Sequence, residues 1–165
     1  MDRRKFLKMA LGGASMLAYA GLFKNNLAMA EGTMVEHLNV TDEEWKKRLD
    51  AQQYDVLRHE GTERAFTSPL NSEKHAGMFV CSGCGLELFP SKFKFDSGTG
   101  WPSFFDSIPG HIETKTDSSL FMQRTEYHCA RCGGHQGHVF NDGPKPTGLR
   151  YCNNGVSLKF VPEKA

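Results

Sequence analysis

Cys81-Ser82-Gly83-Cys84 and Cys129-Ala130-Arg131-Cys132 are two C-x-x-C motifs, and a glycine follows each of them. The two-residue gap allows a tight turn to direct both sulfurs at one ion, and two such turns supply four thiolates for a tetrahedral site. The 44 residues between the motifs exceed the commonest zinc-finger spacing. The tertiary fold must therefore bring the motifs together, and the four cysteines are predicted to bind one zinc ion.

Two other states of these four cysteines are open at this point. Paired cysteines usually become disulfides in an oxidising compartment, and a C-x-x-C motif can also be a redox-active dithiol. No carboxylate or histidine completes either motif, so no coordination position is left open for a substrate. That pattern favours a structural role for the metal.

The sequence between and around the two motifs predicts strands. From residue 78 onward, short apolar or alternating runs are broken by Gly, Ser and Pro. Several short strands with turn signals between them indicate antiparallel sheets rather than repeated βαβ units. The predicted strands are 78–80, 86–89, 93–95, 120–127 and 156–161.

Short helices are predicted ahead of the strands. Thr41 and Glu44 form a capping-box pattern, in which each side chain can bond the other residue's backbone N–H. Trp45 and Leu49 are four residues apart and would share one face of a helix. Residues 54–57 extend the helical pattern into a second short piece.

The first thirty residues are typical of an export signal. A basic stretch at residues 3–8 precedes an apolar run at 9–23, and Ala28-Met29-Ala30 is the small-x-small pattern of a cleavage site. The run is shorter than the roughly 20 residues of a membrane span. Arg3 and Arg4 in the basic stretch resemble a twin-arginine signal. This resemblance predicts export to the periplasm. An uncleaved signal would instead anchor the protein in the membrane.

Charge excludes one class of partner for the rest of the chain. Without residues 1–30, the chain has 15 basic and 18 acidic side chains, a formal charge of −3. Nucleic acids and anionic membranes require a basic face. We therefore expect that the folded part does not bind nucleic acid. Residues 31–40 are predicted to be a linker, and residues 41–165 are predicted to form one soluble, monomeric domain.

Cys152 is the fifth cysteine and is left over after the metal ligands. An unpaired thiol in an exported chain indicates reactivity, although most free cysteines are small buried apolar residues. Arg150 would favour the thiolate and lower the pKa of Cys152. Asn154 follows two residues later in a strand and would face the same side.

His135 and His138 come directly after the second C-x-x-C motif. Such a pair is more often structural or exposed to solvent, and it could also belong to a second metal site. Beside an unpaired cysteine, the two imidazoles become candidate acids or bases.

Several separated motifs resemble the methionine sulfoxide reductase B family. Residues 44–45, 54–58 and 61–63 resemble the N-terminal part of that family, and the resemblance covers roughly residues 41–161. The clearest matches are 94–104 (KFDSGTGWPSF), 135–140 (HQGHVF), 142–144 (DGP) and 150–152 (RYC).

This resemblance implies a mainly β fold of two antiparallel sheets, with short N-terminal helices and a distal four-cysteine zinc site. It implies an oxidoreductase that repairs the R epimer of methionine sulfoxide, free or in proteins, after oxidative stress. Cys152 would attack the sulfoxide sulfur, and His135 and His138 would bond or protonate its oxygen.

The resemblance also assigns supporting roles. Arg150 and Asn154 would position the reacting groups, and Asp142 would orient Arg150. Trp101 would form an aromatic wall for the methyl group of the substrate, with core packing as the alternative role, and Phe140 would help to shape the pocket.

One departure from the family pattern concerns regeneration of Cys152. Many family members have a second cysteine at the position of Thr99, where it forms a disulfide with the catalytic cysteine. Thr99 cannot do so. We expect an external thiol or a thioredoxin-like partner to reduce the sulfenic acid directly.

Two functions of other classes compete with this one. A thiol hydrolase or acyl transferase would use Cys152 with a histidine base and would turn over without a reductant. A zinc-ribbon module that binds a partner protein would leave Cys152 and the two histidines without a role.

Overall fold

The computed structural model describes residues 35–118 and 123–164. The predicted export segment at 1–30, the first part of the predicted linker and the start of the predicted strand 120–127 lie outside the described residues. Export therefore stays a prediction. Within the two described ranges, no helix is both long and apolar enough to cross a membrane.

Two short helices precede the sheets. In α1 (Asp42–Arg48), the Thr41 hydroxyl accepts from the Glu44 N–H at 3.3 Å and Glu44 accepts from the Thr41 N–H at 3.4 Å, which confirms the predicted capping box. A second capping box, between Asp50 and Gln53, begins α2 (Ala51–His59). Trp45, whose side chain is buried, packs the helices onto the core.

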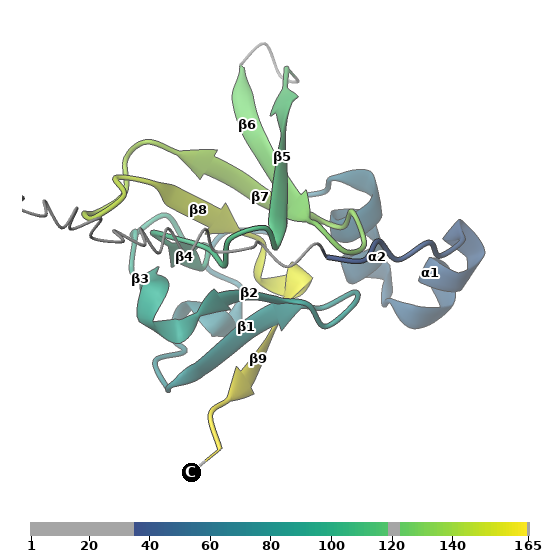
Figure 1. Cartoon of the computed structure of the whole chain (residues 1–165), viewed down its shortest axis with the longest axis horizontal. Coiled ribbons are helices and arrows are strands. Elements are labelled where there is room, and N and C mark those ends of the chain that lie inside the picture. The colour runs from purple at the N-terminus through teal and green to yellow at the C-terminus, as the bar shows by residue number, and fades with distance from the viewer. Residues whose placement is uncertain (1–34, 119–122, 165) are drawn as a thin grey trace, which may run out of the picture. The chain divides into compact units, whose positions relative to one another are not determined.

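The strands form two antiparallel sheets, which confirms the predicted fold class (Figure 1). The three-stranded sheet has β1 (Gly77–Cys81) at its centre, between β2 (Glu87–Pro90) and β9 (Leu158–Pro162). The six-stranded sheet has the order β3-β4-β8-β7-β6-β5. Its strands are β3 (Lys94–Phe95), β4 (Ser103–Phe104), β5 (Ile112–Asp117), β6 (Arg124–Cys129), β7 (His135–Phe140) and β8 (Arg150–Asn153).

The strand predictions were incomplete: no strand range was predicted for β4, β5, β7 or β8, and the last predicted strand begins too early. β5 was missed because none of its residues is buried, so its sequence lacks the apolar alternation that indicates a strand. The predicted strand 156–161 begins later, at Leu158, because a 3-10 turn occupies Gly155–Ser157.

Aromatic side chains join the two sheets. Phe79 and Phe89 from the three-stranded sheet and Phe104 and Tyr127 from the six-stranded sheet are fully buried. The Phe89 and Phe104 rings stack with centroids 4.3 Å apart, and Phe79 meets Phe104 edge to face at 5.0 Å. Such contacts add to the burial of apolar area, so the sheets form one core.

Glu63 attaches the loop after α2 to the end of β8. Its buried carboxylate accepts from the backbone N–H groups of Gly155 and Val156 at 2.5 and 3.1 Å, and its own N–H donates to Asn154 at 3.0 Å. Burial raises the pKa of the Glu63 carboxyl, and the two N–H donors oppose this change. The contact sets the backbone position next to Cys152.

Candidate active site and metal centre

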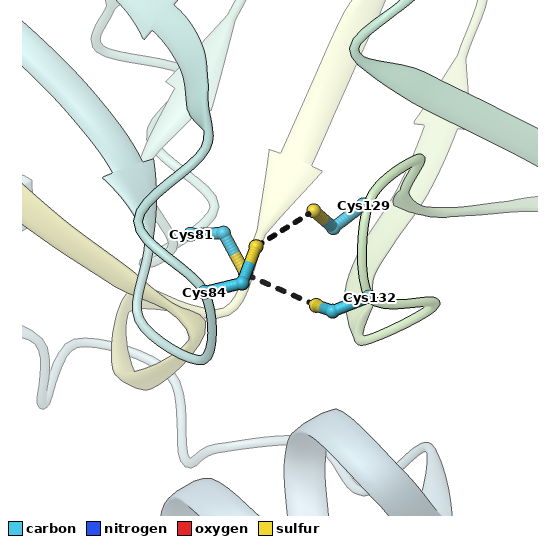
Figure 2. Close-up of side chains that lie close together, drawn as sticks. All are labelled: Cys81, Cys84, Cys129 and Cys132. Carbon is cyan, nitrogen blue, oxygen red and sulfur yellow. Dashed lines mark hydrogen bonds between the residues drawn. The ribbon is translucent and has the colours of Figure 1, made fainter. Parts of the chain in front are cut away.

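Four cysteines from distant parts of the chain converge at the ends of two strands. Cys81 ends β1 and Cys129 ends β6, and each is followed by the turn that holds the second cysteine of its motif. The four sulfurs lie within 4.8 Å of one another. Figure 2 shows the two turns facing each other, with Cys84 directed at Cys129 and Cys81 at Cys132.

The spacing of these sulfurs fits one shared cation. The Cys84–Cys129 and Cys81–Cys132 pairs are 3.5 and 3.7 Å apart. A disulfide would require about 2.05 Å, whereas tetrahedral Zn–S bonds of about 2.3 Å separate the sulfurs by about 3.8 Å. All four cysteines are free. The neighbouring sulfurs and burial raise the pKa of Cys81 well above its usual range, and a bound cation would offset both effects.

Gln136 connects this cluster to the strand that bears the two histidines. Its buried side-chain amide donates to the Cys81 sulfur at 3.5 Å and to the Gly134 carbonyl at 3.3 Å. Its backbone carbonyl accepts from the Asn154 N–H at 2.8 Å and from the Asn154 side chain at 3.2 Å. Sequence reasoning missed Gln136 because only the fold brings residue 81 beside residue 136.

The register of the six-stranded sheet aligns four polar residues. Glu126 on β6 pairs with His138 on β7, His138 pairs with Cys152 on β8, and Cys152 pairs with Ser103 on β4. Residues directly opposite in antiparallel strands place their side chains on the same face. The sheet therefore places polar side chains on both sides of the unpaired thiol.

A cavity of about 190 Å³ lies over this row. Five residues assigned from the sequence line it: Trp101, His138, Phe140, Cys152 and Asn154. The remaining lining residues, Thr62, Arg124, Gly137 and Asn153, were not predicted. His135, Asp142 and Arg150 do not line the cavity: His135 contacts His138, Arg150 contacts Phe140, and Asp142 bonds Arg150.

The Cys152 thiol has a raised pKa. Burial is the largest cause, and Arg150 and a hydrogen bond from the Thr99 hydroxyl oppose it. Arg150 therefore acts in the expected direction, but the expected net decrease is wrong because the loss of hydration outweighs one guanidinium. At neutral pH the free site holds mainly the thiol.

Arg150 is held by two neighbours. Its Nε and Nη2 donate to the two oxygens of Asp142 at 2.7 and 2.8 Å, as expected for a residue oriented by this carboxylate. The guanidinium also lies 4.3 Å from the centre of the Phe140 ring. Phe140 thus lines the cavity and positions the Arg150 guanidinium beside Cys152.

Thr99 belongs to a chain of hydroxyl groups that sequence reasoning did not find. Its hydroxyl lies 2.8 Å from that of Ser97, which lies 2.8 Å from that of Ser103. Ser103 in turn donates to the Trp101 carbonyl at 3.1 Å. These bonds hold the 97–103 loop together and attach it to Ser103, which pairs with Cys152 in the sheet.

His138 is oriented by a carboxylate that the sequence did not indicate. Its Nε2 lies 2.8 Å from Asp117, which Arg124 also contacts at 2.6 Å. Burial lowers the pKa of His138, and the Asp117 contact only partly opposes this change. An ionised carboxylate can only accept, so Nε2 carries the proton and Nδ1 of the neutral ring is an acceptor.

His135 is buried behind His138, with ring centroids 5.5 Å apart. Its Nδ1 lies 2.7 Å from the buried carboxylate of Glu126, and among the described residues its Nε2 has no hydrogen-bond partner. Burial alone would raise the pKa of Glu126, but contacts to His128 and His135 outweigh burial and hold it at about 2. Glu126 therefore fixes the orientation of His135.

Comparison with known proteins identifies the family. Residues 49–162 match the SelR domain. Peptide methionine sulfoxide reductase MsrB of Leptospira interrogans is 54% identical over 127 residues, covering 76% of this chain and 97% of that protein.

The chain belongs to the MsrB family.

Other MsrB relatives agree with this assignment. MsrB of Pseudomonas putida is 55% identical over 78% of this chain and 97% of its own length, and MsrB of Methanosarcina barkeri is 55% identical over 75% and 88%. Membership confirms the resemblance drawn from the motifs at 94–104, 135–140 and 150–152, and makes the chain an enzyme of an oxidoreductase family.

Removal of metal should destabilise this MsrB protein because four neighbouring thiolates would lose their shared cation. We expect chelation to lower the Tm by about 10 °C or more, measured by thermal unfolding alongside metal analysis. The Cys152→Ser variant is the control and should keep both its metal and its Tm. An unchanged Tm after complete removal of metal would contradict a structural role.

Alkylation of Cys152 should depend on Arg150. Because Arg150 opposes the raised pKa of Cys152, Arg150→Gln should raise that pKa further and slow alkylation by iodoacetamide at pH 8 at least about threefold. The rate is followed by mass spectrometry of the Cys152 peptide between pH 6 and 10. Lys159→Gln, which removes an exposed cation on β9, should leave the profile unchanged. Equal profiles for all three proteins would show that Arg150 has no electrostatic role.

Proposed function

We propose that this protein reduces the R epimer of methionine sulfoxide, free or within proteins, to methionine. The observation that carries the proposal is one cavity that combines a half-buried thiol, an indole wall and an oriented imidazole. Cys152, Trp101 and His138 supply these groups. Family membership supports the same reaction, because the relatives are named peptide methionine sulfoxide reductases.

Trp101 would bind the methyl and sulfur end of the substrate. The indole N–H donates to the Glu63 carbonyl at 3.1 Å, which holds the ring in place at the cavity. Sulfur groups make favourable contacts with aromatic rings. The small cavity would therefore hold the side chain with its sulfur near Cys152 and its oxygen near His138.

The proton needed by the sulfoxide oxygen would come from Cys152 itself. The thiol proton passes to Nδ1 of neutral His138 and from there to the oxygen, while the thiolate attacks the sulfur. His135, fixed by Glu126, supports the His138 ring. This sequence suits a thiol of raised pKa, because the thiolate forms when a substrate is present to accept the proton.

The attack balances as a two-electron reduction. A bond forms between the Cys152 and substrate sulfurs, the oxygen is transferred to Cys152, and the bond to the substrate sulfur breaks. Methionine leaves and Cys152 remains as a sulfenic acid. Arg150 and Asn154 would hold the sulfur and the polar end of the substrate during these steps.

Zinc is the metal that four thiolates at this spacing fit best, and Cys81, Cys84, Cys129 and Cys132 would hold it. It would supply structural cross-linking rather than reactivity, because four protein ligands leave no coordination position for substrate. Gln136, bonded to Cys81, would transmit this rigidity to Asn154.

An external reductant would regenerate Cys152. A first thiol attacks the sulfenic acid, forms a mixed disulfide and releases water, and a second thiol then releases Cys152. Thr99 contacts Cys152 but carries no sulfur. The donor would therefore be a small thiol or a thioredoxin-like protein that reaches the cavity directly.

Turnover of separated epimers tests the reaction. With dithiothreitol and no oxygen, the R epimer of a methionine-sulfoxide peptide should be reduced and the S epimer should not. Cys152→Ser should lower kcat at least about a thousandfold, because it removes the nucleophile. Reduction of neither epimer by folded, metal-loaded protein, with ester hydrolysis in the absence of reductant, would favour a thiol hydrolase instead.

The Thr99→Cys variant tests regeneration. After one turnover without reductant, the parent protein should contain a Cys152 sulfenic acid, trapped by dimedone, and no intramolecular disulfide. In Thr99→Cys the introduced thiol should instead form a disulfide with Cys152, because the Thr99 hydroxyl lies near enough to oppose the rise that burial causes in the pKa of the Cys152 thiol. Thr99→Ser is the matched control and should behave like the parent. A Cys152 disulfide in the parent protein would contradict direct reduction.

A further inference from the structure

A second cavity meets the active site at Trp101. It is a groove of about 630 Å³, and Trp101 lines both this groove and the 190 Å³ cavity that contains Cys152. Sites that enclose a whole small ligand usually measure about 300–1,000 Å³. The Cys152 cavity is below that range and suits one side chain, so the remainder of a larger substrate must lie outside it.

Phe66 is the most exposed large apolar side chain among the described residues, with 75% of its surface open to solvent. Its backbone is also unusual, because φ is 66° in the left-handed region that bulky residues avoid. The Phe66 N–H donates to the Gly100 carbonyl at 2.7 Å. A strained residue persists only where its surroundings impose the conformation, and such residues cluster at ligand sites.

The Phe66 ring lies on the loop that carries Thr99 and Trp101. Gly100 has φ of 92°, and a Cβ there would come within 2.8 Å of the Phe66 ring. The glycine therefore allows the ring to rest on the loop backbone while the rest of its surface faces the groove and solvent. The fold thus keeps the Phe66 ring exposed to solvent near Trp101, the residue proposed to bind the oxidised side chain.

We propose that this groove binds the polypeptide on either side of an oxidised methionine, with Phe66 as its main apolar contact. The proposal rests on the proposed function and assigns the part of the protein that would hold the chain flanking the oxidised methionine. The shared Trp101 wall supports this occupant, because a chain with one side chain beside Cys152 can extend past the indole into the groove.

The charges of the groove fit a polypeptide of variable sequence. Glu73 and Asp96 lie among its lining residues together with Lys74 and Lys94. A mixture of both signs does not favour a polyanion such as nucleic acid. An aromatic surface surrounded by donors and acceptors instead suits a chain whose flanking residues differ from one substrate to the next.

Substrate selectivity tests the groove. Free L-methionine-(R)-sulfoxide and a nine-residue peptide with one central methionine-(R)-sulfoxide are compared, both with dithiothreitol so that no protein reductant takes part. Phe66→Asn and Phe66→Ala should lower the ratio of kcat/KM for peptide to that for the free amino acid about five- to tenfold. The change should come from a higher KM for the peptide, with its kcat retained.

The Asn variant separates binding from folding. Asn tolerates the left-handed region, so Phe66→Asn should keep or raise the Tm while it lowers the selectivity ratio. A merely structural role for Phe66 predicts a lower Tm and equal losses on both substrates. Val161→Ala, which truncates an exposed apolar residue of β9 outside the groove, should change neither quantity.

Two outcomes would overturn the proposal in distinguishable ways. If the parent reduces both substrates but neither Phe66 variant changes the ratio, the groove does not bind the peptide. If the variants then lower activity only when thioredoxin is the reductant, the groove binds the reductant instead. If the parent reduces neither substrate, the proposed function itself fails and the role of the groove fails with it.

Discussion

Four sulfurs within 4.8 Å of one another are the constraint on which the rest of the structure depends. Cys81 ends a strand of the three-stranded sheet and Cys129 ends a strand of the six-stranded sheet. One cation shared by the four thiolates would therefore connect the two sheets at a point beyond the aromatic core. Without that charge, neighbouring thiolates would repel one another, and only apolar packing would hold the ends of β1 and β6 together. The position of β7 follows, because its first residues come directly after the second cysteine motif.

The candidate active site depends on this arrangement through buried hydrogen bonds. Gln136 joins the Cys81 sulfur to the backbone beside Asn154, and Glu63 holds the same segment from the other side. The cross-strand register then places His138 opposite Cys152. A half-buried thiol of raised pKa is protected from unproductive oxidation, because the thiolate is the reactive form. Its reactivity would depend on a bound sulfoxide that accepts the proton.

Local signals explain which parts of the fold could be predicted from the sequence. The capping box at Thr41 acts between residues three apart, and the apolar alternation at 78–80 and 86–89 reports directly on burial. β5 carried no such signal because it is an edge strand without buried side chains. β9 begins late because a 3-10 turn occupies Gly155–Ser157. Two hydrogen bonds stabilise this turn: the Ser157 N–H donates to the Asn154 carbonyl, and the Gly155 N–H donates to the Glu63 carboxylate.

The sequence by itself determined the chemistry that is available: four thiols in a pattern that could hold one metal ion, one unpaired thiol and two histidines, in motifs specific enough to indicate the family. It also showed that Thr99 cannot supply a second sulfur. Only the tertiary structure decided the partners of these groups, such as Asp117 for His138, Glu126 for His135 and Gln136 for Cys81. It also decided that burial outweighs Arg150 at Cys152. The physical reason is that hydration and charge–charge contacts depend on distances across strands, which residue spacing along the chain does not specify.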